Sequence, residues 1–165
     1  SGTTQRLVTP MDTFDRTWSR SGRWAMAALR PGQLPSTVEE ADYLQAALDF
    51  EKLATPRQSL QVYEAAVLRW PANRLAWLGA GNNAHRLEDW VRAERAFARA
   101  ADLPGDPAPA LNNLALTLAA QGRVTEAIAV AEQAVAAGGA FEAAARATLA
   151  QLRASHGAST AYPSR

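Results

Sequence analysis

Residues 74–100, RLAWLGAGNNAHRLEDWVRAERAFARA, hold the pattern that decides the fold of this chain. Apolar residues recur at helical spacing in two amphipathic stretches, which a short turn separates. Small residues, Gly81 and Ala93, stand where two paired helices must approach closely, and the bulky Trp77 and Phe97 fill the space between helices. The stretch therefore predicts two helices packed against each other.

The same pattern recurs before and after this stretch at a constant spacing of 34 residues, as in 77 − 43 = 34 and 111 − 77 = 34. No insertion interrupts the period, and six columns of similar residue type come into register. The columns are Tyr43, Trp77 and Leu111; Ala47, Gly81 and Ala115; Phe50, Ala84 and Leu118; Ser59, Ala93 and Ala127; Tyr63, Phe97 and Ala131; and Ala66, Ala100 and Ala134.

This order of bulky, small, apolar, small, aromatic and small positions resembles the tetratricopeptide repeat, a helix–turn–helix unit of about 34 residues. Pro71 matches the terminal proline position of that family in the first copy. The resemblance implies an all-α superhelix of three helix–turn–helix repeats, over about residues 40–73, 74–107 and 108–140. It also implies an interaction scaffold, because such repeats bind protein partners.

Residues typical of helix ends mark the boundaries of these segments. After the last repeat, residues 141–155 hold apolar residues on one helical face, and a repeat stack needs a terminal helix to cover its last face. We therefore expect a capping helix there, followed by a disordered tail over 156–165. The boundary residues are Ser36 with Glu39, Thr55 with Pro56, Asp106 with Pro107, and Gly138 with Gly139.

Residues 1–35 do not follow the repeat and form a separate N-terminal segment. Met11, Phe14 and Trp18 lie at helical spacing and predict a short helix, while RWAMAAL (23–29) predicts a strand. A single strand needs a partner for its backbone. Either it pairs with residues 4–8 as a small ribbon, or its sheet lies in sequence outside this chain.

The N-terminal segment is similar to the closing segment of bacterial papain-like cysteine peptidases of the bacteriocin-processing type, some of which carry tetratricopeptide repeats after it. The similarity rests on Phe14, Trp18 and Trp24 and on the linker RPGQLP (30–35). The catalytic Cys and His of that family would lie upstream of this chain. The resemblance thus implies an alternative function, the non-catalytic C-terminal region of a peptidase, bracing or targeting the catalytic domain.

Composition excludes several other functions. The 165 residues include 17 basic and 16 acidic ones, a formal net charge of +1, which gives no electrostatic basis for binding nucleic acid. There is no cysteine for a disulfide, a thiolate metal site or a nucleophile. No apolar run reaches the ~18 residues of a membrane span. We expect no catalytic residue, metal or cofactor, and the compartment, cytoplasmic or periplasmic, stays open.

One motif suggests a cofactor. GAGNNA (79–84) matches the dinucleotide-binding pattern G-x-G-x-x-G/A, and Asp102 follows at about the distance of its ribose ligand. That site, however, requires a strand before the loop and a second strand after its helix. Here repeat helices are expected on both sides, and Gly81 belongs to a column of small packing residues. The match is therefore interpreted as a coincidence, with Gly79 on the groove-facing side.

The tetratricopeptide resemblance implies that partners bind a concave face made by the first helix of each repeat. Leucines there offer apolar contact, and asparagine amides both donate and accept hydrogen bonds, a mixture suited to an extended peptide. The partner is a peptide or protein, including the N-terminal domain of a parent protein. The candidate ligand-binding residues are Leu44, Gln45, Leu48, Leu78, Asn82, His85, Arg86, Asn112, Asn113 and Leu116.

Asn82 and Asn113 match the asparagine positions of carboxylate-clamp repeats, which hold the C-terminus of a peptide. Leu78 stands where that clamp has its first lysine, so the pattern favours contact along the peptide over a clamp at its end. The alternative interpretation of the asparagines is a consensus residue at 113 and a solvated one at 82. His85 and Arg86 also have a structural alternative, because basic residues are favoured in the last turn of a helix.

Overall fold

The computed structural model describes residues 31–34 and 38–161, and every regular element in that part of the chain is a helix. The predicted helix and strand of the N-terminal segment lie outside the described residues. The elements are α2 (Glu40–Glu51), α3 (Pro56–Arg69), α4 (Arg74–Arg86), α5 (Trp90–Ala101), α6 (Ala108–Ala120), α7 (Val124–Ala137), the 3-10 turn η1 (Gly139–Phe141) and α8 (Glu142–Ala161).

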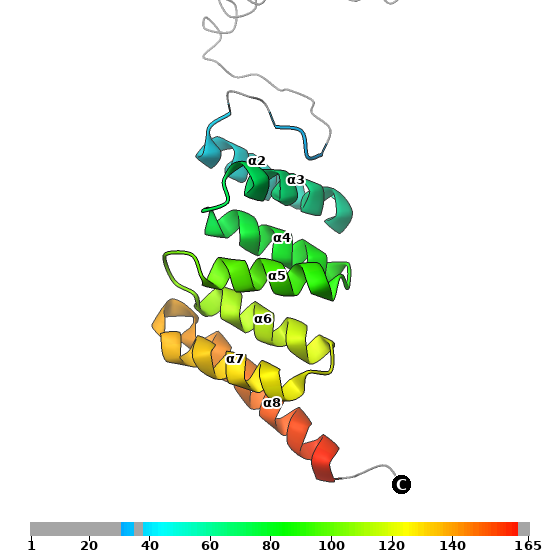
Figure 1. Cartoon of the computed structure of the whole chain (residues 1–165), viewed down its shortest axis with the longest axis vertical. Helices are drawn as coiled ribbons and strands as arrows, with labels where there is room; N and C mark the ends of the chain where they lie inside the picture. Colours follow the sequence, from blue (N-terminus) through cyan, green and yellow to red (C-terminus); the bar gives the residue numbers. More distant parts are fainter. Residues whose placement is uncertain (1–30, 35–37, 162–165) are drawn as a thin grey trace, which may run out of the picture.

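The helices form a stack in chain order, with α2 and α3 at one end and α8 at the other (Figure 1). From α3 onward each helix packs extensively against the next, whereas α2 packs less extensively on α3. The starts of α2, α4 and α6 are separated by 74 − 40 = 34 and 108 − 74 = 34 residues, and those of α3, α5 and α7 by 90 − 56 = 34 and 124 − 90 = 34. The all-α class and the helical-repeat packing are therefore confirmed.

Local capping explains where several helices begin. Thr55 and Gln58 form a reciprocal capping box ahead of α3, with proline in the first turn. Asp106 Oδ1 accepts a hydrogen bond from the Ala108 amide at 2.9 Å at the start of α6. At α2 the predicted capping box of Ser36 and Glu39 was wrong. The helix begins at Glu40, so Glu39 is itself the N-cap residue, and its side chain makes no capping hydrogen bond.

Two glycines of α4 allow its neighbours to pack closely on both sides. A Cβ atom at Gly79 would overlap the ring of Tyr63 in α3, and one at Gly81 would overlap the ring of Phe97 in α5. Both rings are almost fully buried. The packing role predicted for Gly81 is confirmed. Gly79 is not groove-facing as predicted, because the Tyr63 ring covers it.

Two clusters of buried apolar residues make up the core of the described part of the chain. One lies among α2, α3, α4 and α5, and the other lies among α6, α7 and α8. Leu114 of α6 packs against both clusters and so connects them. The columns of small residues, from Ala47 and Ser59 to Ala115 and Ala127, are buried, as close helix packing requires.

Helix α8 covers the end of the stack by packing on α7 and α6. Ala145 and Leu152 on its inner face are buried, and Thr148 and Leu149 are half-buried. The helix is longer than predicted: it continues to Ala161 instead of ending at 155, so residues 156–161 are helical and not part of a disordered tail.

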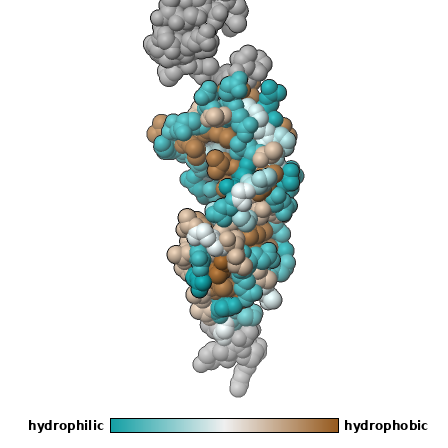
Figure 2. All heavy atoms as spheres, turned by 90° about the vertical axis from the view of Figure 1, so that its left-hand side faces the viewer, coloured by the Kyte–Doolittle hydropathy of each residue, from teal (hydrophilic) through white to brown (hydrophobic). Residues whose placement is uncertain are grey.

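The face seen in Figure 2 carries hydrophobic and hydrophilic residues interspersed along the stack. Several leucines are exposed, with Leu53 at 93% and Leu68 at 84%. None of the helices described here has both the length and the apolar character that a membrane span requires.

Candidate functional site

A surface hollow of about 270 Å³ lies between α4 and α6, and Phe97 of α5 forms part of its wall. We call it the α4–α6 hollow. Its other lining residues all come from the set predicted from the sequence, and they stand on two helices that occupy the same place in successive repeats. They are Asn82, His85 and Arg86 of α4 and Asn113 and Leu116 of α6.

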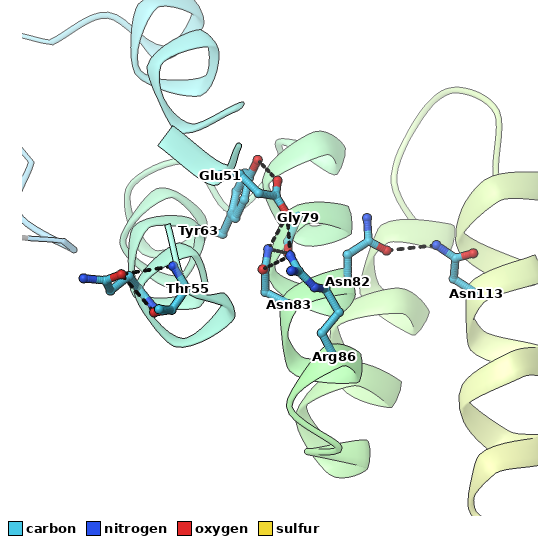
Figure 3. A network of polar contacts seen from close by, with 9 residues as sticks. Glu51, Thr55, Tyr63, Gly79, Asn82, Asn83, Arg86 and Asn113 are labelled. Atoms are coloured by element: carbon cyan, nitrogen blue, oxygen red, sulfur yellow. Dashed lines mark hydrogen bonds and ion pairs between the residues drawn. The ribbon is translucent and has the colours of Figure 1, made fainter. Parts of the chain in front are cut away.

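Two asparagines bridge the hollow. Asn113 Nδ2 donates to Asn82 Oδ1 at 3.0 Å, so the two side chains point toward each other from α6 and α4 (Figure 3). Asn112 Nδ2 in turn donates to Asn113 Oδ1 at 3.3 Å. Asn82 accepts in this chain of amides, and among the described residues no group accepts from its Nδ2, which is therefore available as a donor.

His85 of α4 is held by groups of two other helices, α5 and α6. Its Nδ1 lies 3.1 Å from Thr117 Oγ1, and its ring meets Trp90 edge-on with centroids 5.0 Å apart. The Thr117 hydroxyl donates its single proton to the Asn113 carbonyl at 2.8 Å. We therefore infer that His85 Nδ1 carries the proton toward Thr117, which leaves Nε2 as an acceptor. Burial lowers the pKa of His85, which favours the neutral ring.

Arg86 stands beside a polar network that joins α2, α3 and α4 (Figure 3). Glu51 accepts from the Tyr63 hydroxyl at 2.9 Å and from Asn83 Nδ2 at 2.8 Å, and the same Nδ2 donates to the Gly79 carbonyl at 2.9 Å. Arg86 makes longer contacts, 3.4 Å to Asn83 Oδ1 and 3.9 Å to Glu51 Oε1. Its half-exposed guanidinium therefore keeps donors available beside the hollow.

Burial, and then the contact with Glu51, raises the pKa of the Tyr63 phenol. The phenol thus stays protonated and remains a donor to the carboxylate. This network is structural, because Tyr63 and Asn83 are almost fully buried and offer no surface to a ligand. It holds the last turn of α2 against α3 and α4.

The other predicted site residues lie outside the hollow. Gln45 and Leu48 are exposed on α2, where Gln45 bonds Asp49 at 3.2 Å, and Leu78 is half-buried against the core. For two residues the predicted surface position was wrong. Leu44 and Asn112 are only 7% and 5% exposed, because both side chains turn toward neighbouring helices and away from solvent.

Sequence reasoning missed Phe97 and Thr117, which shape the hollow and hold His85. The repeat pattern predicts that Phe97 packs between helices. Its ring does pack against Gly81, and it also borders the hollow. Thr117 follows Leu116 directly and is fully buried. The signal in the sequence was a threonine on the side of α6 that packs against other helices. A hydroxyl buried there needs a hydrogen-bond partner, and so indicates a polar contact between helices.

Among the described residues, no three His, Cys, Asp or Glu side chains come together in a way that could hold a metal ion. Comparison with known proteins finds no matching family model and no matching curated protein. The fold therefore defines the class of this protein. It is an all-α helical-repeat protein with a hollow between two equivalent helices of successive repeats.

Proposed function

We propose that this chain is a tetratricopeptide-type interaction scaffold that binds an extended segment of a partner protein in the α4–α6 hollow. The 34-residue spacing of both sets of helix starts supports the repeat assignment. The binding role rests on the site itself, because one repeat fold serves many functions.

The observation that carries the proposal is the Asn82–Asn113 pair across the hollow. The free Nδ2 of Asn82 and the guanidinium of Arg86 offer donors to a peptide carbonyl or carboxylate. Leu48 and Leu116 occupy the same repeat position as Asn82, since 48 + 34 = 82 and 82 + 34 = 116, and both are exposed. An extended peptide would thus meet apolar contacts on either side of the amide.

The test is a peptide-display selection against the whole chain, followed by fluorescence anisotropy with the best binder. Replacing Asn82→Ala together with Asn113→Ala should weaken binding by roughly tenfold or more. The matched control, Gln133→Ala with Gln151→Ala, removes two exposed amides from α7 and α8 and should leave the affinity unchanged. Undiminished binding by the asparagine variant would refute a site in the hollow.

The alternative function, the non-catalytic C-terminal region of a papain-like cysteine peptidase, rests on residues 1–35. Only residues 31–34 of that segment are described, so this alternative remains a prediction from the sequence. Reading the gene upstream of Ser1 tests it directly. The alternative requires a cysteine and a histidine there in a papain-like setting, and their absence would end it.

A further inference from the structure

A second groove lies between α3 and α5, on a surface other than the α4–α6 hollow. Two adjoining hollows, of about 350 and 110 Å³, share Leu60, Glu64 and Arg92. The larger one opens at Leu87 in the turn before α5, and the smaller one reaches Ala80 of α4. We call the two together the α3–α5 groove.

The groove is open at its inner end because a small residue stands there. Ala80 corresponds to Leu114 in the next repeat, since 80 + 34 = 114. Leu114 packs against both core clusters, whereas the side chain of Ala80 ends at Cβ. Trp77 and Ala96 line the space that is left, so the floor of the groove is apolar.

The rim of the groove carries an excess of positive charge. Arg92 lies 3.4 Å from Glu64 and 3.3 Å from Asp89, so one guanidinium engages both carboxylates that line the groove. Arg57 and Arg95 also line it, and neither has an ion-pair partner among the described residues. Two arginines at the groove are therefore available to an external acid.

Helix α5 separates its charges between two sides. Arg92, Arg95 and Arg99 follow at intervals of three and four residues and therefore share one face. The acidic Glu94 is held elsewhere, by Arg123 at 2.7 Å and by Gln121 at 3.0 Å. The chain is almost neutral overall, so this basic face is a local feature.

We propose that the α3–α5 groove binds an acidic segment of a partner protein. Carboxylates of that segment pair with Arg57 and Arg95, and one apolar side chain enters the space above Ala80. A protein segment fits better than nucleic acid, because two available arginines beside an apolar floor suit separate carboxylates and one apolar side chain, whereas a continuous phosphate backbone needs a longer basic surface. The proposal concerns a surface separate from the α4–α6 hollow and does not depend on the function proposed for it.

The test uses the whole chain and a fluorescein-labelled synthetic peptide in which glutamates flank one leucine, with a serine-for-glutamate peptide as its neutral counterpart. Anisotropy should show binding of the acidic peptide that weakens with added salt. Arg57→Glu with Arg95→Glu should weaken it by roughly tenfold or more. Ala80→Leu, which places the residue of the next repeat in the gap, should weaken it by at least about fivefold.

Two control variants separate this groove from other surfaces. Arg69→Glu with Arg153→Glu makes the same change in charge elsewhere and should leave binding of the acidic peptide intact, as should Asn82→Ala with Asn113→Ala. Circular dichroism establishes that each variant is folded. Retained binding by both groove variants, or equal weakening by either control, would overturn the proposal.

Other occupants give distinct results. No binding of the acidic peptide overturns the proposal outright. Equal binding of oligothymidylate, lost in the same groove variants, would reassign the groove to nucleic acid. A dimer in light scattering that Ala80→Leu dissociates would assign it to a second copy of the chain.

Discussion

The ring of Tyr63 lies so close to the backbone of Gly79 that a Cβ atom at position 79 would overlap it. The contact joins α3 to α4, and the Tyr63 hydroxyl continues to Glu51 at the end of α2. One glycine therefore allows three helices to meet. Its absent side chain, which makes glycine a poor helix former, is what the packing requires here.

Gly79→Ala should destabilise the protein by about 1–3 kcal/mol, because over-packing exceeds the ~1 kcal/mol gain in helix propensity. Gly157→Ala is the matched control in α8, where an added Cβ meets no atom within 4 Å, and it should be neutral or stabilising. Urea unfolding followed by circular dichroism measures both. A Gly79→Ala protein as stable as the parent would contradict the close packing of Tyr63.

The adjacent residues Asn82 and Asn83 should respond differently to the same substitution. Asn83→Ala removes donors to Glu51 and to the Gly79 carbonyl in a buried setting and should cost about 1–3 kcal/mol of stability. Asn82 is exposed, so Asn82→Ala should change stability by less than about 0.5 kcal/mol. Denaturant midpoints of the two variants check this, and equal losses would contradict the assignment of Asn83 to structure and Asn82 to the surface.

Stability should fall in acid because of the contacts of Glu94 and Glu126. Hydrogen bonds from Gln121 and Arg123 lower the pKa of Glu94, and Arg123 lowers the pKa of Glu126. Because the folded-state pKa of each glutamate is lowered, its contacts contribute to the free energy of unfolding at a pH above 4.5, the pKa in the unfolded chain. That contribution is lost as the pH falls through the folded-state pKa. Between about pH 7 and about pH 3, the Tm of the double variant Glu94→Gln with Glu126→Gln should therefore fall by less than the Tm of the parent protein. Parallel curves for both proteins would show that these contacts do not matter.

The pKa of His85 should lie below the ordinary histidine value of 6.5, because burial disfavours the charged ring. The unfolded chain then binds the proton more tightly, so this residue contributes a loss of stability as the pH falls below 6.5. NMR titration of the ring measures the pKa, and nitrogen shifts report which nitrogen carries the proton at neutral pH. A proton on Nε2 would contradict the hydrogen bond inferred from Nδ1 to Thr117.

The helical class and the order of the helices were predictable because they depend on local chemistry repeated along the chain. The columns headed by Tyr43 and Ser59 recur at every 34 residues, and the helices begin at the same interval. Thr55 with Pro56 and Asp106 stand near helix starts because capping satisfies amides within a few residues. The length of α8 was underestimated, because HGASTA lacks the apolar pattern on which the prediction relied.

The sequence by itself determined an all-α repeat and brought Asn82, His85, Arg86, Asn113 and Leu116 forward as candidates. Only the tertiary structure decided which first-helix residues face solvent. Neighbours such as Asn112 and Asn113 differ by about 100° around a helix, and packing against adjacent helices sets the rotation that buries one of them. The same packing brings Glu51 to Asn83, 32 residues away, a distance that no local pattern encodes.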